Sequence, residues 1–273
     1  MHRHTLLKLA LLPCALFFTV SVAQAQYKAE DREPPHTEGT GRSQQTEEPP
    51  TPPSVAVPRS ELFDDVRAKR KQLSKSEKRL LAPPQEDYEL YTDFLRQPRT
   101  GLIRLLPRET FDGKLAIQGG GAYYSFARLT HEYGYGSDIE LQRGNFSVGF
   151  AGADFGFMVN LGDAPIETIT AETEALSFMA SFRPPSPEQD ARKTKRGFGG
   201  DGQQSGQWSY KNRLPAVAGN TYALRSVSYD RSDVLVVFRV VRKDFDGSAV
   251  LLWKMLKKYQ KPALERSNVA AGS

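Results

Sequence analysis

The sequence has only one cysteine, Cys14, and only four histidines among its 273 residues. Since no cysteine follows Cys14, the rest of the chain cannot form a disulfide bond, a zinc–thiolate site or a cysteine nucleophile. His131 is the only histidine after residue 36, so no second histidine can share a metal ion with it. The GxSxG and HExxH motifs are absent as well. These absences favour a protein that is not an enzyme, and we expect neither a metal nor a cofactor.

The first 25 residues have the three-part pattern of a secretory signal peptide. Arg3 and Lys8 precede an apolar run over residues 9–22, and Ala23-Gln24-Ala25 supplies a cleavage site. The run is shorter than the roughly 20 residues that a spanning helix needs, which leaves a retained anchor as the lesser alternative. We expect an exported protein, periplasmic or secreted after cleavage near Ala25, and not an integral membrane protein.

Two segments separate the signal peptide from the expected domain. Residues 26–59 are rich in proline, glutamate and threonine, and such a segment buries too little apolar surface to fold, so we interpret it as a disordered tether. Residues 60–84 read as a helical linker, in which SKSE at 74–77 resembles a capping box. The next stretch, PQEDYELYTDFLRQP, has apolar residues at helical spacing.

From residue 101 onward, short apolar or alternating segments are separated by glycine, aspartate, asparagine and proline. Many short strands at such spacing indicate a β-rich fold. We expect one α+β or mostly β domain over 85–262, with short N-terminal helices packed on an antiparallel sandwich- or barrel-like sheet. A mobile surface loop is expected over 183–206, and a frayed tail over 263–273. The strands expected before that loop are 102–106, 114–117, 122–129, 138–141, 146–150, 155–161 and 176–182.

The last third of the sequence has the strongest strand character, over 222–229, 233–243 and 248–256. DFDG at 244–247 predicts a tight turn that joins the last two strands in a C-terminal hairpin. VLVVF at 234–238 is continuously apolar, which is typical of a strand buried on both faces. We therefore expect it at the centre of the sheet. Periodicity leaves open whether 248–256 ends as strand or helix.

Charge is distributed unevenly along the chain. Residues 109–182 have ten acidic and three basic side chains, a net charge of −7, whereas residues 222–261 have nine basic and four acidic ones, a net charge of +5. The two segments either pair within one fold or present a basic face to an anionic surface, a protein partner or a second copy. The whole chain has a charge of +5, which falls to +3 without Arg3 and Lys8. That charge does not indicate nucleic acid as a partner.

The stretch IQGGGAYYSFARLTHEYGYGSDIEL, residues 117–141, is the candidate binding site. Its glycines match neither the phosphate-loop nor the dinucleotide-binding pattern, so we interpret them as a bulge or a close approach of two backbones. Aromatic rings exposed on one face could stack on a sugar, although strand alternation places neighbouring rings on opposite faces. His131 is expected on the surface of a hairpin loop. The candidate binding residues are Tyr123, Tyr124, His131, Tyr133 and Tyr135.

The same region offers the only support for an enzyme. Two carboxylates on either side of a glycosidic bond can hydrolyse it, and Glu132, Asp138, Glu140 and Asp154 lie near the aromatic residues in the sequence. Glu132, Asp138 and Asp154 are the candidate catalytic residues, but no spacing selects two of them.

We therefore predict an exported, non-catalytic binding or interaction module whose ligand is a glycan, an envelope component or a protein partner. A carboxylate-based hydrolase of an extracellular polymer is one alternative. A structural or assembly protein of the cell envelope, in which the acidic middle of one copy meets the basic end of another, is the second.

Overall fold

The computed structural model describes residues 73–131, 133, 134 and 136–266. Its centre is a five-stranded sheet in the order β1-β11-β10-β9-β5, which we call the large sheet. All neighbouring strands in it are antiparallel. The predicted C-terminal hairpin is present as β10 and β11, and β10 holds the central position. The five strands are β1 (Thr100–Leu105), β5 (Phe155–Asn160), β9 (Thr221–Ser228), β10 (Ser232–Lys243) and β11 (Ala249–Lys258).

Strand β10 is buried on both faces, as its continuous apolar sequence predicts. Val236 and Phe238 belong to the core on one face of the large sheet, whereas Leu235 and Val237 belong to the core on the other. This alternation is the period-two geometry of a β-strand. The large sheet is therefore the middle layer of three.

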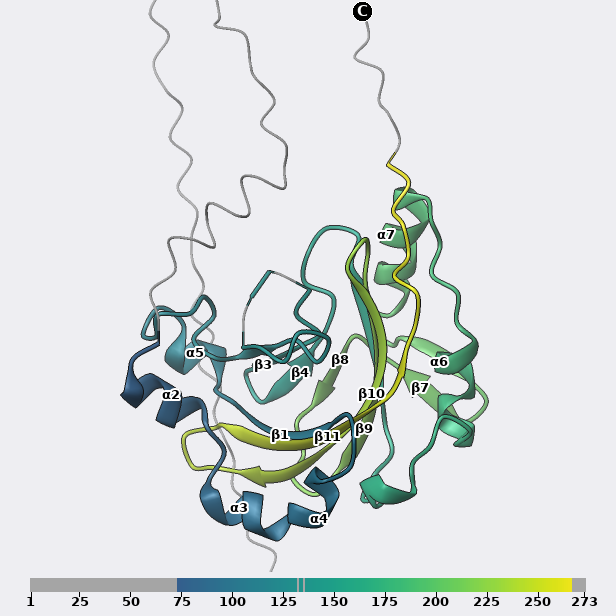
Figure 1. Cartoon of the computed structure of the whole chain (residues 1–273). Helices are drawn as coiled ribbons and strands as arrows, with labels where there is room; N and C mark the ends of the chain where they lie inside the picture. The colour runs from purple at the N-terminus through teal and green to yellow at the C-terminus, as the bar shows by residue number, and fades with distance from the viewer. Residues whose placement is uncertain (1–72, 132, 135, 267–273) are drawn as a thin grey trace, which may run out of the picture. The chain divides into compact units, whose positions relative to one another are not determined.

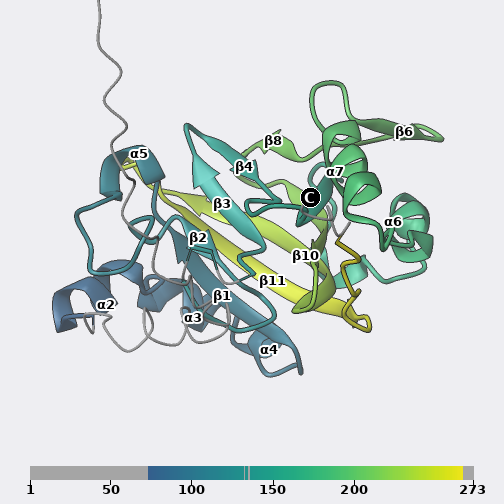
Figure 2. The same cartoon turned by 90° about the horizontal axis from the view of Figure 1, so that it is seen from above.

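A smaller four-stranded antiparallel sheet, in the order β2-β3-β4-β8, covers one face of the large sheet. Figure 1 shows β3 and β4 on one side of β10, with α6 and α7 on the other. In the view from above, β3 and β4 lie over the large sheet (Figure 2). The strands of the small sheet are β2 (Tyr123–Tyr124), β3 (Ile139–Gln142), β4 (Asn145–Ser147) and β8 (Arg213–Pro215). A separate hairpin consists of β6 (Gln203–Ser205) and β7 (Trp208–Tyr210).

Short helices cover the opposite face, where their apolar side chains join one core. These helices are α4 (Thr92–Leu95), η1 (Ile166–Thr168), η2 (Glu174–Leu176), α6 (Ser177–Ser181) and α7 (Glu188–Gly197). The remaining helices are α2 (Lys75–Leu81), α3 (Gln85–Leu90) and α5 (Arg108–Phe111).

The fold class predicted from the sequence is confirmed: the domain is mostly β, with antiparallel sheets and a few short helices. In the part of the chain that the structure describes, no helix is long and apolar enough to cross a membrane. The expected signal peptide (1–25), the tether (26–59) and the helical pattern over 60–72 lie outside the described residues.

Helix α2 begins with the capping box that SKSE predicts. The Ser74 hydroxyl accepts a hydrogen bond from the Glu77 amide, and the Glu77 carboxylate accepts one from the Ser74 amide. At the other end of α2, the Leu80 carbonyl accepts a hydrogen bond from Arg104 of β1. The sequence assigns this helix to a linker, but these contacts attach it to the folded body.

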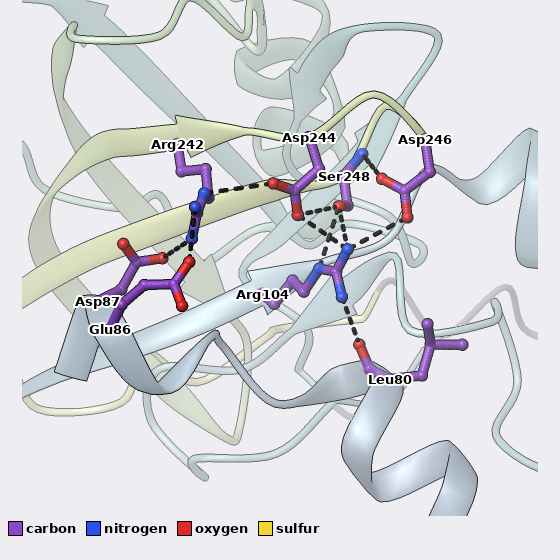
Figure 3. A network of polar contacts seen from close by, with 8 residues as sticks. All are labelled: Leu80, Glu86, Asp87, Arg104, Arg242, Asp244, Asp246 and Ser248. Atoms are coloured by element: carbon purple, nitrogen blue, oxygen red, sulfur yellow. Dashed lines mark hydrogen bonds and ion pairs between the residues drawn. The ribbon is translucent and has the colours of Figure 1, made fainter.

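Arg104 and Arg242 connect helices α2 and α3 to the turn between β10 and β11 (Figure 3). The Arg104 guanidinium lies 2.8 Å from Asp244 Oδ2 and 3.2 Å from Asp246 Oδ2. Arg242 pairs with Asp87 of α3 at 3.0 Å and with Asp244 at 3.4 Å. Because these side chains come from three separate segments, the network fixes the DFDG turn against α2 and α3.

Three expected strands differ in the structure. Residues 114–117 form turns, and of 122–129 only Tyr123–Tyr124 are in a strand. Residues 176–182 include helix α6, since Phe178 and Phe182, four positions apart, both pack against Phe157. A short apolar run is compatible with either element.

The expected loop over 183–206 is instead a ten-residue helix, α7, followed by strand β6. Helix α7 has acids in its first turn and bases in its last, which suits the helix dipole. Ala191 is the only buried residue of α7. The helix therefore has no apolar stripe from which sequence periodicity could predict it. Residues 248–256 remain in one strand, β11. Within the expected tail, the Glu265 amide donates to the Ser186 carbonyl and the Glu265 carbonyl accepts from the Glu188 amide, each at 2.9 Å. The first residues of the tail are therefore bonded to the folded body.

The acidic middle and the basic end of the chain meet within the fold. Arg231 lies 3.4 Å from the Asp154 carboxylate, Arg239 donates to the Asp163 carbonyl at 2.9 Å, and Lys254 donates to the Glu167 carbonyl at 3.1 Å. The two segments are therefore in contact within one fold, and the Arg231–Asp154 pair is the contact among these three that joins opposite charges.

Candidate functional site

Gly119, Gly120 and Gly121 form a tight turn, with φ angles of 81°, 59° and 82° that favour glycine. A Cβ atom on Gly120 would lie 2.2 Å from the Phe111 carbonyl, and one on Gly119 would lie 2.3 Å from the Tyr123 ring. The triplet therefore permits a close approach of backbones, as its sequence context predicts.

Tyr123 and Tyr124 form strand β2 and are buried, with exposed fractions of 2% and 6%. Tyr124 packs against His131, with the ring centroids 5.0 Å apart. Burial raises the pKa of the Tyr124 hydroxyl to about 12 and also raises that of Tyr123. Neither ring offers an open face to a ligand, which corrects the expectation of an exposed platform at these two positions.

Among the tyrosine and phenylalanine rings of this cluster that the structure describes, Tyr133 and Phe150 are partly exposed. Tyr133 lies 4.7 Å from the Tyr123 ring and Phe150 lies 5.1 Å from it, measured between centroids. The buried Tyr123 thus packs against both rings. Tyr133 is among the residues predicted from the sequence, whereas Phe150 is not.

A small pocket lies beside these rings. Its cavity volume is about 10 Å³, which is room for one water-sized group and far below the roughly 300–1,000 Å³ of sites that enclose a small molecule. It can therefore take one functional group of a ligand that rests outside it. The pocket is lined by Gly134, Gly136, Ser137, Gly149, Phe150, Ala151, Asp154, Phe155 and Ser226–Ser228.

Asp154 supplies the carboxylate of this pocket. Its Oδ1 accepts a hydrogen bond from the Tyr229 amide at 2.9 Å, and its Oδ2 lies 3.4 Å from the Arg231 guanidinium, a long contact for a hydrogen bond. Burial raises the pKa of Asp154, while the Tyr229 amide, Arg231 and Lys195 act in the opposite direction. Oδ2 can thus accept a further hydrogen bond from a ligand.

Ser226 and Ser228 add hydroxyl groups from strand β9. They are two positions apart, so both face the side of the small sheet, and they are 3% and 2% exposed. Neither serine is among the residues predicted from the sequence. Their alternate positions within the strand-like segment YALRSVSY were the available signal.

Asp138 lies just behind the pocket and has no exposed surface. Its Oδ2 accepts hydrogen bonds from the Phe126 amide at 2.7 Å and from the Ala127 amide and Ser125 hydroxyl, each at 3.3 Å. Among the described residues, Oδ1 has no hydrogen-bond partner. Burial raises the pKa of Asp138 to about 6, although the Ser226 hydroxyl and these donors oppose the shift. The Asp138 carboxylate therefore stabilises the turn at residues 125–130 through these hydrogen bonds. It is too deeply buried to contact a ligand.

His131 is partly buried instead of lying on the loop surface. Burial lowers the pKa of its imidazole to about 4, so the ring is neutral at pH 7. Its Nδ1 is buried and has no hydrogen-bond partner within the described part of the chain. With the Tyr124 ring against it, His131 acts as a packing residue of the loop.

Glu140 is paired and inaccessible, with its side chain only 6% exposed and its Oε1 3.1 Å from Arg108. A glycosidase needs two carboxyl groups that face one cleft, whereas Asp138 and Glu140 are both buried. Glu132 and Tyr135 lie outside the described residues. Within 73–131, 133–134 and 136–266, no group of three or more acidic, histidine or cysteine side chains could hold a metal ion.

The structure thus brings Asp154 together with Phe150, Ser226 and Ser228 at one pocket, and Tyr133 directly precedes Gly134, which also lines it. Tyr123, Tyr124, His131 and Asp138 form the buried support behind it. No protein-family model, no curated protein and no solved structure matches this chain.

Proposed function

We propose that the chain is an exported, non-catalytic binding module whose ligand is a glycan. The observation that carries the proposal is a pocket lined by the Asp154 carboxylate, three serines and the partly exposed Phe150 ring, with the partly exposed Tyr133 next to the lining residue Gly134. A sugar ring has an apolar face that stacks on an aromatic ring and hydroxyls that need hydrogen-bond partners. The site offers an aromatic surface for the apolar face and hydrogen-bonding groups for the hydroxyls of one sugar residue.

The small volume of the pocket supports binding of an extended polymer from outside. Only one hydroxyl enters the pocket, while the sugar ring rests on Tyr133 and Phe150 and its neighbours continue across the surface. Export is supported by the signal-peptide pattern of residues 1–25. The compartment of an exported protein is where envelope or extracellular polysaccharides are found.

Hydrolysis has less support than binding. The candidate Asp138 has no exposed surface, and Asp154 already accepts from the Tyr229 amide and faces Arg231. Among the described acids, Asp154 is therefore the only candidate that lines the pocket, and a second carboxylate facing it would be needed for glycoside cleavage.

Assembly through charge is the second candidate function. Asp163, Glu167 and Glu172 are exposed on the acidic middle, and Lys258 and Lys261 on the basic end. None of the five has an ion pair among the described residues. Two copies could join these surfaces in a salt-sensitive contact.

The test of the binding proposal is the affinity for a panel of soluble polysaccharide fragments, measured by isothermal titration calorimetry on the full chain. Tyr133→Ala should weaken binding about tenfold, because stacking contributes about 0.5–1.5 kcal/mol beyond the area it buries. Phe245→Ala is the matched control, since Phe245 is a fully exposed aromatic at the β10–β11 turn. Binding that is unchanged in Tyr133→Ala, or absent across the whole panel, would contradict the proposal.

A further inference from the structure

The segment that contains α7 and the C-terminal segment 257–266 lie side by side (Figure 1). The Glu265 amide donates to the Ser186 carbonyl, and the Glu188 amide donates to the Glu265 carbonyl, each at 2.9 Å. Residues 183–196 have five basic and two acidic side chains, and residues 257–266 have four basic and one acidic. The fold thus joins two segments with a combined charge of +6.

The cations of α7 are gathered on one side of the helix. At 3.6 residues per turn, its four basic positions fall within an arc of about 160°, and the buried Ala191 lies beyond one edge of that arc. Within the arc, the acidic side chain is that of Glu188, which pairs with Arg192 at 2.6 Å. The four cations are Arg192, Lys193, Lys195 and Arg196, of which Lys195 is half-buried and the others are exposed.

The nearest acids leave this positive charge in excess. Asp154 faces both Lys195 and Arg231, and Asp230 pairs with Arg266 at 3.6 Å. Arg231 and these two acids together add one negative charge, so a surplus of five positive charges remains. Four exposed cations of the two segments have no ion pair among the described residues, and we call them the basic face: Lys193, Arg196, Lys258 and Lys261.

The basic face is an open surface and not an enclosed anion site. No lysine or arginine lines the pocket of the candidate site, so these charges lie outside it. A small anion would contact one or two of the cations, whereas a polymer with repeated negative charges contacts several at once and gains affinity from each. The arrangement therefore suits a polyanion.

The surroundings of the cations favour a soluble polymer over a lipid bilayer. A helix that docks on a bilayer inserts an apolar face, whereas the buried residue of α7, Ala191, packs in the core. The exposed large apolar side chains of the described residues lie on other segments: Tyr88, Leu90, Leu129, Val217 and Phe245. The signal-peptide pattern of residues 1–25 supports export, which favours an acidic polysaccharide over nucleic acid.

We infer that the basic face of α7 and the C-terminal segment binds an acidic polysaccharide through its repeated negative charges. The inference goes beyond the proposed function, because it concerns a surface outside the pocket and does not require the pocket to bind a sugar.

The experiment measures the affinity of the full chain for polygalacturonate oligomers by isothermal titration calorimetry. Neutral dextran oligomers of matched length are the comparison. At about 0.05 M salt the acidic oligomers should bind at least about tenfold more tightly than dextran, and at about 0.5 M salt this preference should be lost, because salt screens exposed charges.

A charge variant and a matched control test the location. Both replace four exposed cations by glutamine, so both should fold and both change the net charge equally. The basic-face variant should bind polygalacturonate at least about tenfold more weakly, since each exposed charge contributes a small favourable interaction. It is Lys193→Gln/Arg196→Gln/Lys258→Gln/Lys261→Gln, and the control on α2 and the following turn is Lys75→Gln/Lys78→Gln/Arg79→Gln/Lys114→Gln.

The outcomes separate this inference from the proposed function. Acidic oligomers that bind no more tightly than dextran, or a basic-face variant that binds like the α2 control, would overturn the inference. So would salt-sensitive binding to phosphatidylglycerol vesicles without binding to polygalacturonate. Tyr133→Ala reports on the pocket: if it leaves polygalacturonate binding unchanged while the basic-face variant weakens it, the inference is supported independently of the pocket.

Discussion

Replacing Arg225 with methionine should cause the largest loss of stability among the single substitutions considered for this fold. Arg225 and Asp233 are 1% and 2% exposed and form a bidentate pair, with Nε–Oδ1 at 2.6 Å and the second hydrogen bond at 2.8 Å. The guanidinium also donates to the Met179 carbonyl at 2.9 Å and lies 3.3 Å from the centre of the Tyr259 ring. It therefore links β9, β10 and α6 to Tyr259, the residue that follows β11.

The size of the loss follows from the carboxylate that remains. Arg225→Met leaves Asp233 buried without its partner, and removing one member of a buried ion pair costs about 3–5 kcal/mol. That is a large part of the roughly 5–15 kcal/mol by which a domain is stable. The double variant Arg225→Met/Asp233→Leu removes the orphaned charge as well, so it should recover most of the loss.

The pH dependence of the variant gives a second signature. Burial raises the pKa of Asp233, and Arg225 opposes that shift, so the folded-state pKa should rise further in Arg225→Met. An acid with a raised folded-state pKa loses stability as pH rises from its unfolded to its folded value. The cost of Arg225→Met should therefore be smallest near pH 4 and largest above neutrality.

The assay is urea unfolding followed by far-UV circular dichroism, with linear extrapolation to water. Arg192→Met is the control, because Arg192 is 50% exposed and pairs with Glu188 one helical turn away, and such surface pairs contribute about 0.3–0.5 kcal/mol. A cost below about 1 kcal/mol for Arg225→Met, or a double variant no more stable than the single one, would refute the reasoning.

Two other predictions concern Asp138 and self-association. Burial raises the pKa of Asp138 from 3.8 to about 6, so the unfolding free energy should fall by about 2 kcal/mol as pH rises from 4 to 7. The asparagine in the variant Asp138→Asn cannot ionise, so the unfolding free energy of that variant, measured by urea titration, should not show this fall. Equal pH dependence of the unfolding free energy in the wild type and the variant would contradict the prediction. If the acidic and basic surfaces join copies, sedimentation velocity should show oligomers that dissociate between 0.05 and about 0.5 M salt, and salt-independent sedimentation would exclude that contact.

The sequence predicts the centre of the fold well because hydrophobic burial determines it. VLVVF has no polar position, so it needs cover on both faces, and β10 has that cover from two cores. Helix α7 was not predicted, because hydrophobic burial hardly shows in its sequence. Its residues are nearly all polar, and its place is set by Ala191 and the following Phe198, which pack in the core under the helix.

Sequence patterns reach only part of the candidate site. The aromatic density around residue 123 leads to the region that holds the pocket, but single-sequence patterns do not show that Gly119 must lie against Tyr123 and so help to bury that ring. Ser226 and Ser228 come from a strand about a hundred residues away in the sequence, and only the pairing of β9 with β5 and β10 brings them to the pocket. Contacts of such long range depend on the whole topology.

The most direct test of glycan binding at this pocket is an NMR titration of the ¹⁵N-labelled full chain with the soluble polysaccharide fragment that binds best. If the pocket binds a glycan, the largest amide shifts should cluster at residues 133, 134, 136, 137, 149–151 and 226–228. Shifts confined to the basic end of β11, or no shifts at saturating oligomer, would contradict it.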